Sequence, residues 1–289
     1  MGIAATVNEW FRGNARDLPW RRAGFGAWGI LVSEIMLQQT QVDRVIPRLA
    51  AWLERWPTPT ALAASPPGDA VRAWDRLGYP RRALRLHAAA TAIADRHDGV
   101  VPHDVDELLA LPGIGDYTAR AVAAFAYGVR VPVVDTNVRR VIARAVLGQG
   151  EAGPPSTRRD LAAMNALLPE DPADARLFNA AVMELGAIVC TARAPRCEVC
   201  PIAEACRWRL DGYAPYEGPR SARQPRFEGS DRQVRGVLLR ALRGSDIPVT
   251  GEELASLWPD AEQRERALAG LLADGLAVAV DDGYELPRD

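Results

Sequence analysis

The segment 104–127, DVDELLALPGIGDYTARAVAAFAY, decides the fold, because Leu111-Pro112-Gly113-Ile114-Gly115 separates two stretches of helical periodicity within it. Glycine lets the backbone turn sharply, and its missing Cβ lets a ligand approach the main chain. Around Gly113 and Gly115, the amide groups that open the second stretch point outward, where they can bind a phosphate. The pattern predicts a helix–hairpin–helix that contacts a nucleic-acid backbone; a plain tight turn between two helices is the alternative.

The flanking sequence continues the same helical periodicity, interrupted by proline and glycine, along most of the first 190 residues. Helices are predicted over 4–13, 26–40, 42–55, 68–76, 81–97, 104–110, 116–127, 137–147, 157–168 and 174–190. Few runs alternate in the way that strands require. The body of the protein is therefore predicted to be mainly α, without an internal repeat.

Composition places the chain among ordinary globular proteins, since 48% of its 289 residues are hydrophobic and 25% are charged. The N-terminal sequence lacks the apolar run of a secretory signal or a membrane span, so we expect a cytoplasmic protein without a membrane partner. The formal net charge of −2 hides an asymmetry: 230–289 carries 12 acidic and 7 basic side chains, whereas the rest has a net charge of +3. This small excess permits DNA binding without arguing for it.

The stretch 213–229 is rich in Pro, Arg and Gly and has no periodicity, which predicts a linker between a body, 1–212, and a small domain, 230–289. In the small domain we expect helices over 231–243, 251–258 and 260–274, with a capping box from Thr250 to Glu253. A strand, 276–280, a turn at 281–283 and a second short strand follow, the element order of a winged-helix-like module. Its net charge of −5 favours protein contact or structural packing over DNA contact.

The cysteines form one cluster with the spacing C-x6-C-x2-C-x5-C. They are Cys190, Cys197, Cys200 and Cys206. In a cytosolic chain this pattern indicates a metal site rather than disulfides, and four thiolates suit either zinc or a [4Fe–4S] cluster. Structural zinc usually shows two close pairs, but only Cys197 and Cys200 are close, so the spacing favours the iron–sulfur cluster.

Two carboxylates, Glu34 and Asp135, have unusual surroundings. Glu34 lies in a predicted helix that is apolar on nearly every side, which implies burial, a raised carboxyl pKa and the capacity to act as a general acid. A solvated helix residue is the alternative. Asp135 follows the apolar run 131–134 and precedes a basic helix, so it is either a plain N-cap or a functional anion.

The stretch from Arg16 to about Ala214 resembles adenine DNA glycosylases of the MutY type, in the endonuclease III-like superfamily. The motifs that carry the resemblance are LPWR (18–21), SEIMLQQTQV (33–42), LGY (77–79), LPGIGDYTA (111–119), VDTNVRRV (134–141), FN (178–179) and MELG (183–186). The cysteine spacing is also that of the superfamily's iron–sulfur loop. The resemblance implies a helix–hairpin–helix glycosylase fold in which 25–135 forms a six-helix subdomain, and the N-terminal segment with 136–212 forms an iron–sulfur subdomain.

The resemblance also implies roles for single residues. Glu34 would protonate adenine at N7, and Asp135 would stabilise the resulting oxocarbenium-like sugar, with Asn137 and Tyr117 holding the carboxyl groups and water in position. The flipped adenine would contact Arg16, Trp20, Arg21, Leu37 and Glu184. Gln39, Thr40, Leu77 and Tyr79 would wedge into the duplex and contact the opposite guanine. The partner is duplex DNA with adenine opposite 8-oxoguanine or guanine, and we expect a monomer, associated with the nucleoid if it is prokaryotic.

Two alternatives stay open. All 35 basic residues are arginine, and Tyr117 stands where lysine-dependent relatives have their lysine, so we expect a glycosylase without lysine-dependent lyase activity. A thymine-mismatch glycosylase of the same superfamily can share Tyr117 and Asp135, and a non-catalytic iron–sulfur DNA-binding protein needs neither Glu34 nor Asp135. The sequence departs from the family at Arg76 and Pro80, and its tail is too short for the family's guanine-gripping domain, so we expect weaker 8-oxoguanine discrimination.

Overall fold

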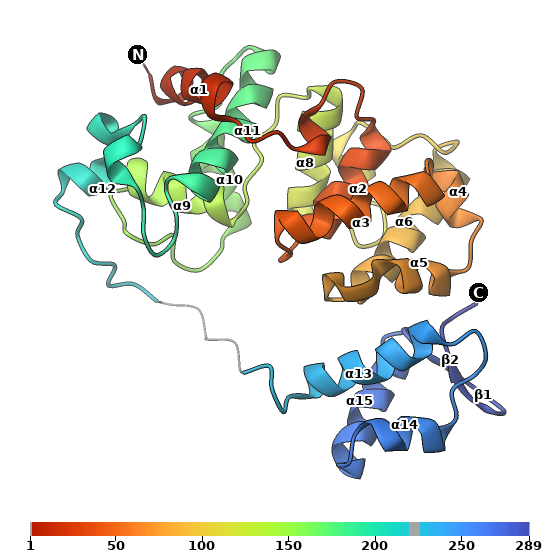
Figure 1. Ribbon diagram of the computed structural model, residues 1–289. Coiled ribbons are helices and arrows are strands. Elements are labelled where there is room, and N and C mark those ends of the chain that lie inside the picture. Colours follow the sequence, from red (N-terminus) through yellow and green to blue (C-terminus); the bar gives the residue numbers. More distant parts are fainter. Residues whose placement is uncertain (1, 220–225, 289) are drawn as a thin grey trace. The chain divides into compact units, whose positions relative to one another are not determined.

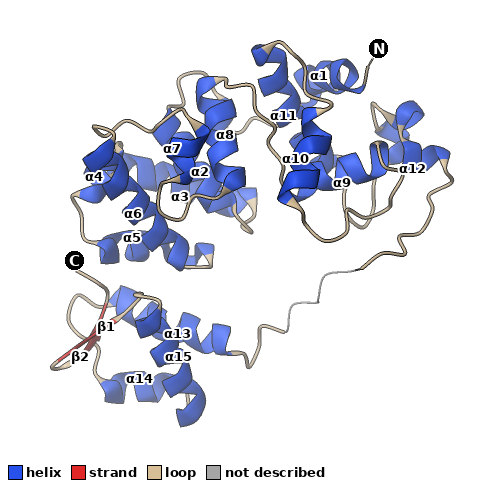
Figure 2. Cartoon of the chain, turned by 180° about the vertical axis from the view of Figure 1, so that it is seen from behind, coloured by secondary structure: helices blue, strands red, loops and turns tan. Residues whose placement is uncertain are grey.

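The computed structural model describes residues 2–219 and 226–288, and helices make up nearly all of its regular structure (Figure 1). The sheet within these residues is a single antiparallel hairpin, β1 (Val278–Val280) with β2 (Gly283–Glu285), drawn in red in Figure 2. The mainly α fold class is therefore confirmed. None of the helices described is both long and apolar enough to cross a membrane.

The chain forms two compact units. The first comprises Met1–Ile30, His103–Leu109 and Gly115–Ala222, and the second comprises Leu31–Pro102, Ala110–Ile114 and Arg223–Asp289. The predicted division into a six-helix subdomain, an iron–sulfur subdomain, a linker and a tail stays a prediction, and part of that linker, 220–225, lies outside the described residues.

The predicted helices are present, each end lying within three residues of its expected place. The first unit holds α1 (Ile3–Asn14), η1 (Pro19–Arg21), α7 (Val105–Leu109), α8 (Asp116–Tyr127), α9 (Thr136–Ala145), α10 (Thr157–Asn165), α11 (Pro172–Ile188), η3 (Cys197–Val199), η4 (Ala203–Ala205) and α12 (Arg207–Leu210). The second holds α3 (Val42–Arg55), α4 (Pro59–Ala63), α5 (Pro67–Trp74), η2 (Asp75–Leu77), α6 (Arg81–Arg96), α13 (Asp231–Gly244), α14 (Gly251–Leu257) and α15 (Ala261–Ala273). Helix α2 (Ala27–Leu37) crosses from one unit to the next.

The core of the first unit forms where α1, α9 and α11 bury their apolar faces against each other. Val7, Val138, Phe178 and Leu185 are fully buried there. Gly186 sets the spacing, since a Cβ at this position would lie 2.7 Å from the Asn137 Cβ and 2.9 Å from its carbonyl oxygen. Glycine at 186 therefore lets α11 approach the first turn of α9, where the candidate site lies.

Helix α2 ends earlier than predicted, at Leu37 rather than residue 40. Gln39 has a φ of 56°, in the left-handed region, which breaks the helix. The carbonyl oxygens of Ile35 and Met36 accept hydrogen bonds from Arg82 Nη1 at 2.7 and 3.0 Å, and this guanidinium takes the place of further helical amides. The sequence around 38–40 alone carries no sign of this distant partner.

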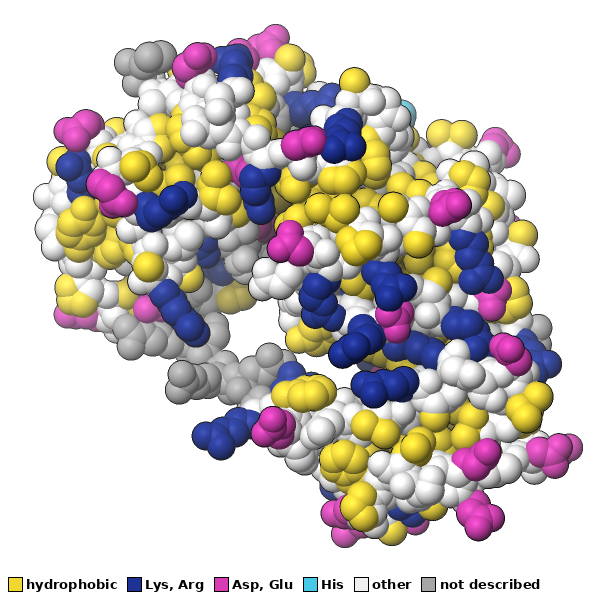
Figure 3. Space-filling model, viewed as in Figure 1, with side chains coloured by type: hydrophobic (Ala, Val, Ile, Leu, Met, Phe, Trp, Pro, Cys, Tyr) yellow, Lys and Arg dark blue, Asp and Glu magenta, His cyan; other side chains and the backbone are white. Residues whose placement is uncertain are grey.

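The tail, 230–288, has the predicted order of three helices and a hairpin, and the capping box of Thr250 and Glu253 is present. It packs within the second unit: Gly68 N–H donates to the Pro287 carbonyl at 2.8 Å, and Arg243 Nη1 donates to the Asp75 carbonyl at 2.5 Å. The space-filling view shows arginine side chains gathered on this unit near the tail (Figure 3). The tail thus has an internal packing surface around α5 and η2.

Candidate functional site

The hairpin between α7 and α8 contains two glycines, and their structural roles differ. Gly113 has a φ of 74°, and a Cβ there would lie 2.7 Å from the Arg85 Cβ, so the turn itself needs glycine. Gly115 is extended and forms the N-cap of α8, and a Cβ there would meet nothing within 4 Å. Open space therefore lies beside the first amides of α8, as a phosphate contact requires.

The extended segment before Asp135 is held by a buried amide side chain. The Oδ1 atom of Asn179 accepts a hydrogen bond from the Val133 N–H at 2.9 Å, and its Nδ2 donates to the Val131 carbonyl at 3.0 Å. Asn179 is fully buried on α11. The FN motif at 178–179 thus fixes the strand-like approach to Asp135.

Asp135 is the N-cap of α9, and both of its oxygens accept hydrogen bonds. Oδ1 accepts from the Val138 N–H at 2.7 Å, and Oδ2 accepts from Asn137 Nδ2 at 2.8 Å. Burial raises the pKa of Asp135, while these two donors and the nearby Arg140 lower it again in part. The capping role is present and both oxygens act as acceptors, which opposes the effect of burial, but the pKa of Asp135 as a whole stays raised.

A hydrogen-bonded chain leads from Asp135 to the cysteine loop. The Oδ1 atom of Asn137 accepts from Arg140 Nη2 at 2.7 Å, and Arg140 also donates to the carbonyls of Cys190 and Gly186, each at 2.7 Å. Sequence reasoning missed Arg140. The sequence did contain a signal: Arg140 lies three residues after the predicted site residue Asn137, and residues three apart on a helix share a face.

Glu34 lies in the middle of α2 and is only 4% exposed. Its helix neighbours Leu31, Val32, Ile35 and Met36 are buried as well. The predicted burial is thus confirmed, and the solvated alternative is wrong. Glu34 belongs to the second unit, whereas Asp135, Asn137 and Tyr117 belong to the first. The Tyr117 ring, in the first turn of α8, packs against the small cluster that contains Val133.

Three residues of the expected adenine contact set come together around Glu184. Its side chain accepts from Arg16 Nε at 2.7 Å, from Arg16 Nη2 at 2.8 Å and from Arg21 Nη2 at 2.9 Å. Burial alone would raise the pKa of Glu184, but these hydrogen bonds and the two positive charges hold it at about 2. Trp20 lies in η1, half-buried, within the same unit, while Leu37 belongs to the second unit.

The four residues expected to contact the opposite base lie on two neighbouring turns of the second unit, which a buried arginine joins. Arg82 Nη1 donates to the Gln38 carbonyl at 2.6 Å, and Nη2 donates to Thr40 Oγ1 at 2.9 Å and the Gly78 carbonyl at 2.9 Å. Burial lowers the pKa of Arg82 to about 10. Sequence reasoning missed this residue too.

Exposure differs among those four residues. Gln39 and Tyr79 are exposed, with φ values of 56° and 47°, whereas Leu77 is 3% and Thr40 9% exposed. Thr40 Oγ1 also donates to the Leu77 carbonyl at 3.1 Å. Tyr79 therefore presents its ring to solvent already, while Leu77 can insert into a duplex only if its turn moves.

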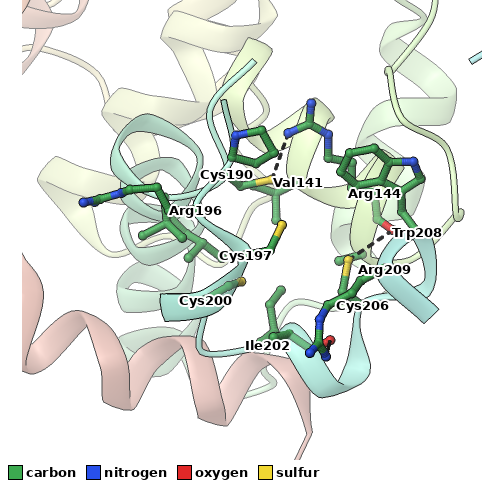
Figure 4. A pocket seen from close by; sticks show the side chains of 15 residues that line it. Val141, Arg144, Cys190, Arg196, Cys197, Cys200, Ile202, Cys206, Trp208 and Arg209 are labelled. Carbon is green, nitrogen blue, oxygen red and sulfur yellow. Dashed lines mark hydrogen bonds between the residues drawn. The ribbon is translucent and has the colours of Figure 1, made fainter. Parts of the chain in front are cut away.

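All four cysteines line one pocket beside α9 and α12 (Figure 4). Arg144 Nη1 donates to the Cys190 sulfur at 3.4 Å, and none of the described residues that line this pocket carries a carboxylate. Among the described side chains, no three His, Cys, Asp or Glu converge on a single-ion site. Burial raises the pKa of the Cys200 thiol to about 11, so ligation must displace its proton. A donor set of four thiolates beside a cationic hydrogen-bond donor fits an iron–sulfur cluster.

Comparisons with known proteins agree with this geometry. Residues 32–165 match the HhH-GPD superfamily of base excision DNA repair proteins, and 190–206 match the iron–sulfur binding domain of endonuclease III. The chain is 58% identical over 276 residues to the adenine DNA glycosylase of Mycolicibacterium smegmatis, covering 95% of this chain and 92% of that protein. It is 55% identical over 282 residues to the one of Mycobacterium tuberculosis, covering 97% and 92%. A thermostable thymine-DNA glycosylase of known structure superposes with a TM-score of 0.66 at 27% identity, covering 72% of this chain and 95% of that one.

Fold and site together define a base-excision DNA repair protein with a helix–hairpin–helix. Within that class, the chain belongs to the adenine DNA glycosylase family, which hydrolyses the N-glycosyl bond of adenine in DNA. Its four cysteines hold a [4Fe–4S] cluster, as the spacing predicted, and the zinc alternative is set aside.

Proposed function

We propose that the protein removes adenine mispaired with 8-oxoguanine or guanine, through acid catalysis by Glu34 and charge stabilisation by Asp135. The observation that carries this proposal is the contrast between the two carboxyl groups. Glu34 is buried in an apolar helix, which favours the protonated form. Burial raises the pKa of Asp135 as well, but Asp135 accepts two hydrogen bonds and lies near Arg140, and these act in the other direction and support the anion.

In this mechanism the Glu34 carboxyl gives its proton to adenine N7, and the bond between the sugar C1′ and adenine N9 breaks. The bonding electrons leave with the base, so positive charge develops on the sugar. Asp135 stabilises that charge, directly or through a transient covalent bond, until water adds at C1′ and loses a proton, which restores the protonated Glu34 carboxyl. Asn137, which donates to Asp135 at 2.8 Å, holds the carboxylate in position, and Tyr117 serves the same end. The products are free adenine and an abasic site.

The adenine must first leave the helical stack, which costs a few kcal/mol and least at a defective pair. We assign its contacts to Arg16, Trp20, Arg21, Leu37 and Glu184. The ion pairs of Arg16 and Arg21 with Glu184 already fix three of these side chains in the free protein. A pre-organised contact set loses less entropy when the base arrives.

The opposite 8-oxoguanine is assigned to Gln39, Thr40, Leu77 and Tyr79, and the first amides of α8 near Gly113 and Gly115 to a backbone phosphate. The cluster shapes the loop that carries it and takes no part in the chemical step. The packing of the tail against α5 supports a structural role for the tail, so discrimination between guanine and 8-oxoguanine rests mainly on the body. The proposal places a monomer in the cytoplasm, at the nucleoid if the source is prokaryotic.

A single-turnover assay tests the proposal, with duplexes that carry adenine opposite 8-oxoguanine, adenine opposite guanine, and thymine opposite guanine. We expect excision in the order given, with little or none of thymine. Faster release of thymine would establish the thymine-mismatch alternative, and no release from any duplex would establish the non-catalytic one.

The strand should stay intact until alkali or heat is applied, because the chain has no lysine to form an imine. Efficient borohydride trapping of a covalent enzyme–DNA adduct would contradict this part of the proposal, unless the adduct maps to the N-terminal amine.

A further inference from the structure

An open pocket of about 460 Å³ lies beside the turn that carries the expected wedge residues, and arginine dominates its lining. The residues that line it are Arg44 and Arg48 from α3, with Asp75, Arg76 and Leu77 from η2. Figure 3 shows arginine side chains gathered on this face of the second unit. Both elements belong to this unit, so the pocket is a feature of one compact body.

The charges around this pocket are not balanced within the protein. Three guanidinium groups face one carboxylate, Asp75, which pairs with Arg48. Arg44 donates to the Arg76 carbonyl and so helps to shape the rim. The structure describes no hydrogen bond or ion pair for the exposed Arg76 side chain. A surplus of positive charge at an open surface attracts an anion.

We propose that this pocket binds a backbone phosphate of the DNA strand that carries the opposite guanine, with Arg76 as the principal contact. The inference rests on the proposed function for the assignment of that strand. Leu77 follows Arg76 directly and lines the same pocket, so a duplex contacted by this turn brings its backbone to the pocket. Each strand carries a negative charge about every 3.4 Å along the helix axis, so a phosphate is always close to a contacted base.

Chemistry favours a phosphate over an acidic protein side chain as the occupant. Guanidinium groups bind phosphate oxygens in a bidentate way, and two or three of them around one pocket suit a group with several anionic oxygens. The tail is hydrogen-bonded to the segments next to the pocket. Arg243 of the tail donates to the Asp75 carbonyl, and Arg72 of α5 donates to the Ser245 carbonyl of the tail at 3.1 Å. The tail thereby fixes the η2 turn on which Asp75 and Arg76 lie.

The test is the salt dependence of DNA affinity for the holoprotein and its Arg76→Gln variant. The probe is a duplex with 2′-fluoro-2′-deoxyadenosine opposite 8-oxoguanine, because the fluorine slows excision, compared with an undamaged duplex. We expect Arg76→Gln to weaken binding to both duplexes alike and to lower the slope of log affinity against log salt by about one. Arg76→Lys should restore the slope, because it restores the charge.

The matched control is Arg96→Gln, another exposed arginine of the second unit without a described side-chain partner, and it should leave the slope unchanged. Equal thermal stability of all variants excludes a folding defect. An unchanged slope for Arg76→Gln, or a loss confined to the mispaired duplex, overturns the phosphate site. Failure of the proposed function is separate, since it would appear as absent adenine release while the salt slopes still differ.

Discussion

The two carboxyl groups of the proposed mechanism are anchored in different ways, although an arginine supports each: the half-buried Arg140 on the Asp135 side and the buried Arg82 on the Glu34 side. Asp135 is connected through Asn137 and Arg140 to the carbonyl of a cluster ligand, Cys190. Glu34 lies one and two residues before Ile35 and Met36, whose carbonyls are bonded by Arg82. From this difference we expect the carboxylate assigned to the sugar to depend on the cysteine loop, and the acid assigned to the base to depend on the turns near Thr40 and Leu77, which we assign to the opposite base.

The largest effects are expected from changing the carboxylates themselves. Glu34→Gln keeps the shape but removes the donated proton, so single-turnover excision should fall by about 10²–10⁴-fold while the mispair is still bound. Asp135→Asn should lower it by about 10²–10³-fold through lost charge stabilisation. Rapid-quench assays with a binding measurement on the same duplex would decide both.

Asp171→Asn is the matched control, because Asp171 caps α11 as Asp135 caps α9, accepting from the Asp174 N–H at 2.9 Å. Asparagine also caps helices well, so this variant should excise adenine at the normal rate. A normal rate for Asp135→Asn as well would show that Asp135 is only a helix cap and would contradict its proposed role in charge stabilisation.

Features that depend on residues close together in the chain could be predicted from the sequence, whereas features that depend on a distant hydrogen-bond partner could not. The periodic helices, the hairpin at 111–115 and the capping box of Thr250 were predictable, because each depends on residues close together in the chain. The spacing of the cysteines favoured an iron–sulfur cluster but left zinc open, and the resemblance to the superfamily's iron–sulfur loop decided between the two. The end of α2 was not predictable, since Arg82 reaches it from 44 to 47 residues away. Helix α4 was not predicted either: it has five residues, as α7 does, but it lies among Pro57, Pro59 and Pro66, which interrupt the helical pattern.

The second largest effect should come from Arg82, whose loss tests the dependence of α2 on the turns near Thr40 and Leu77. Arg82→Met leaves several buried acceptors without a donor, and each such group costs about 1–3 kcal/mol, so the free energy of unfolding should fall by at least about 3 kcal/mol. The ratio of excision rates opposite 8-oxoguanine and guanine should fall on the order of tenfold, about 1.4 kcal/mol.

Arg82→Lys serves as the milder variant, because it keeps the charge and some of the donors and should therefore lie between the wild type and Arg82→Met in both measurements. Urea unfolding and paired single-turnover assays supply them, with exposed Arg96→Met as control. A purely structural residue would lower stability and leave the ratio of the two rates unchanged, which would separate Arg82 from base discrimination.

A third prediction uses loss of the iron–sulfur cluster to distinguish the hydrogen bonds that hold Asp135 from those near Glu34. Cys200→Ser should lose cluster content, seen as weaker yellow-brown absorption near 400 nm and fewer than about four irons per chain. Hydrogen exchange should then speed up in the first turns of α9, around Asn137 and Arg140, because their hydrogen bonds reach the Cys190 carbonyl. Exchange in α2 and α6 should change little. Equal acceleration in α6 would show that the cofactor supports the whole protein rather than the Asp135 side.

The smallest effect concerns Glu184, whose pKa of about 2 reflects Arg16 and Arg21 acting against burial. A carboxyl whose pKa is lowered in the folded state contributes stability that is complete above its ordinary value, 4.5, and is lost as pH falls toward 2. The Arg16 side chain is 39% exposed, so solvent screens part of this contribution. Carbon-13 NMR of the carboxyl groups should therefore show Glu184 still ionised at pH 4. Between pH 7 and 5, titration of Glu184 should then make no contribution to the pH dependence of the excision rate opposite 8-oxoguanine. If Glu184 titrates near 4.5, its ion pairs with Arg16 and Arg21 are too weak to hold these side chains in place, and the proposal of a pre-organised adenine site is contradicted.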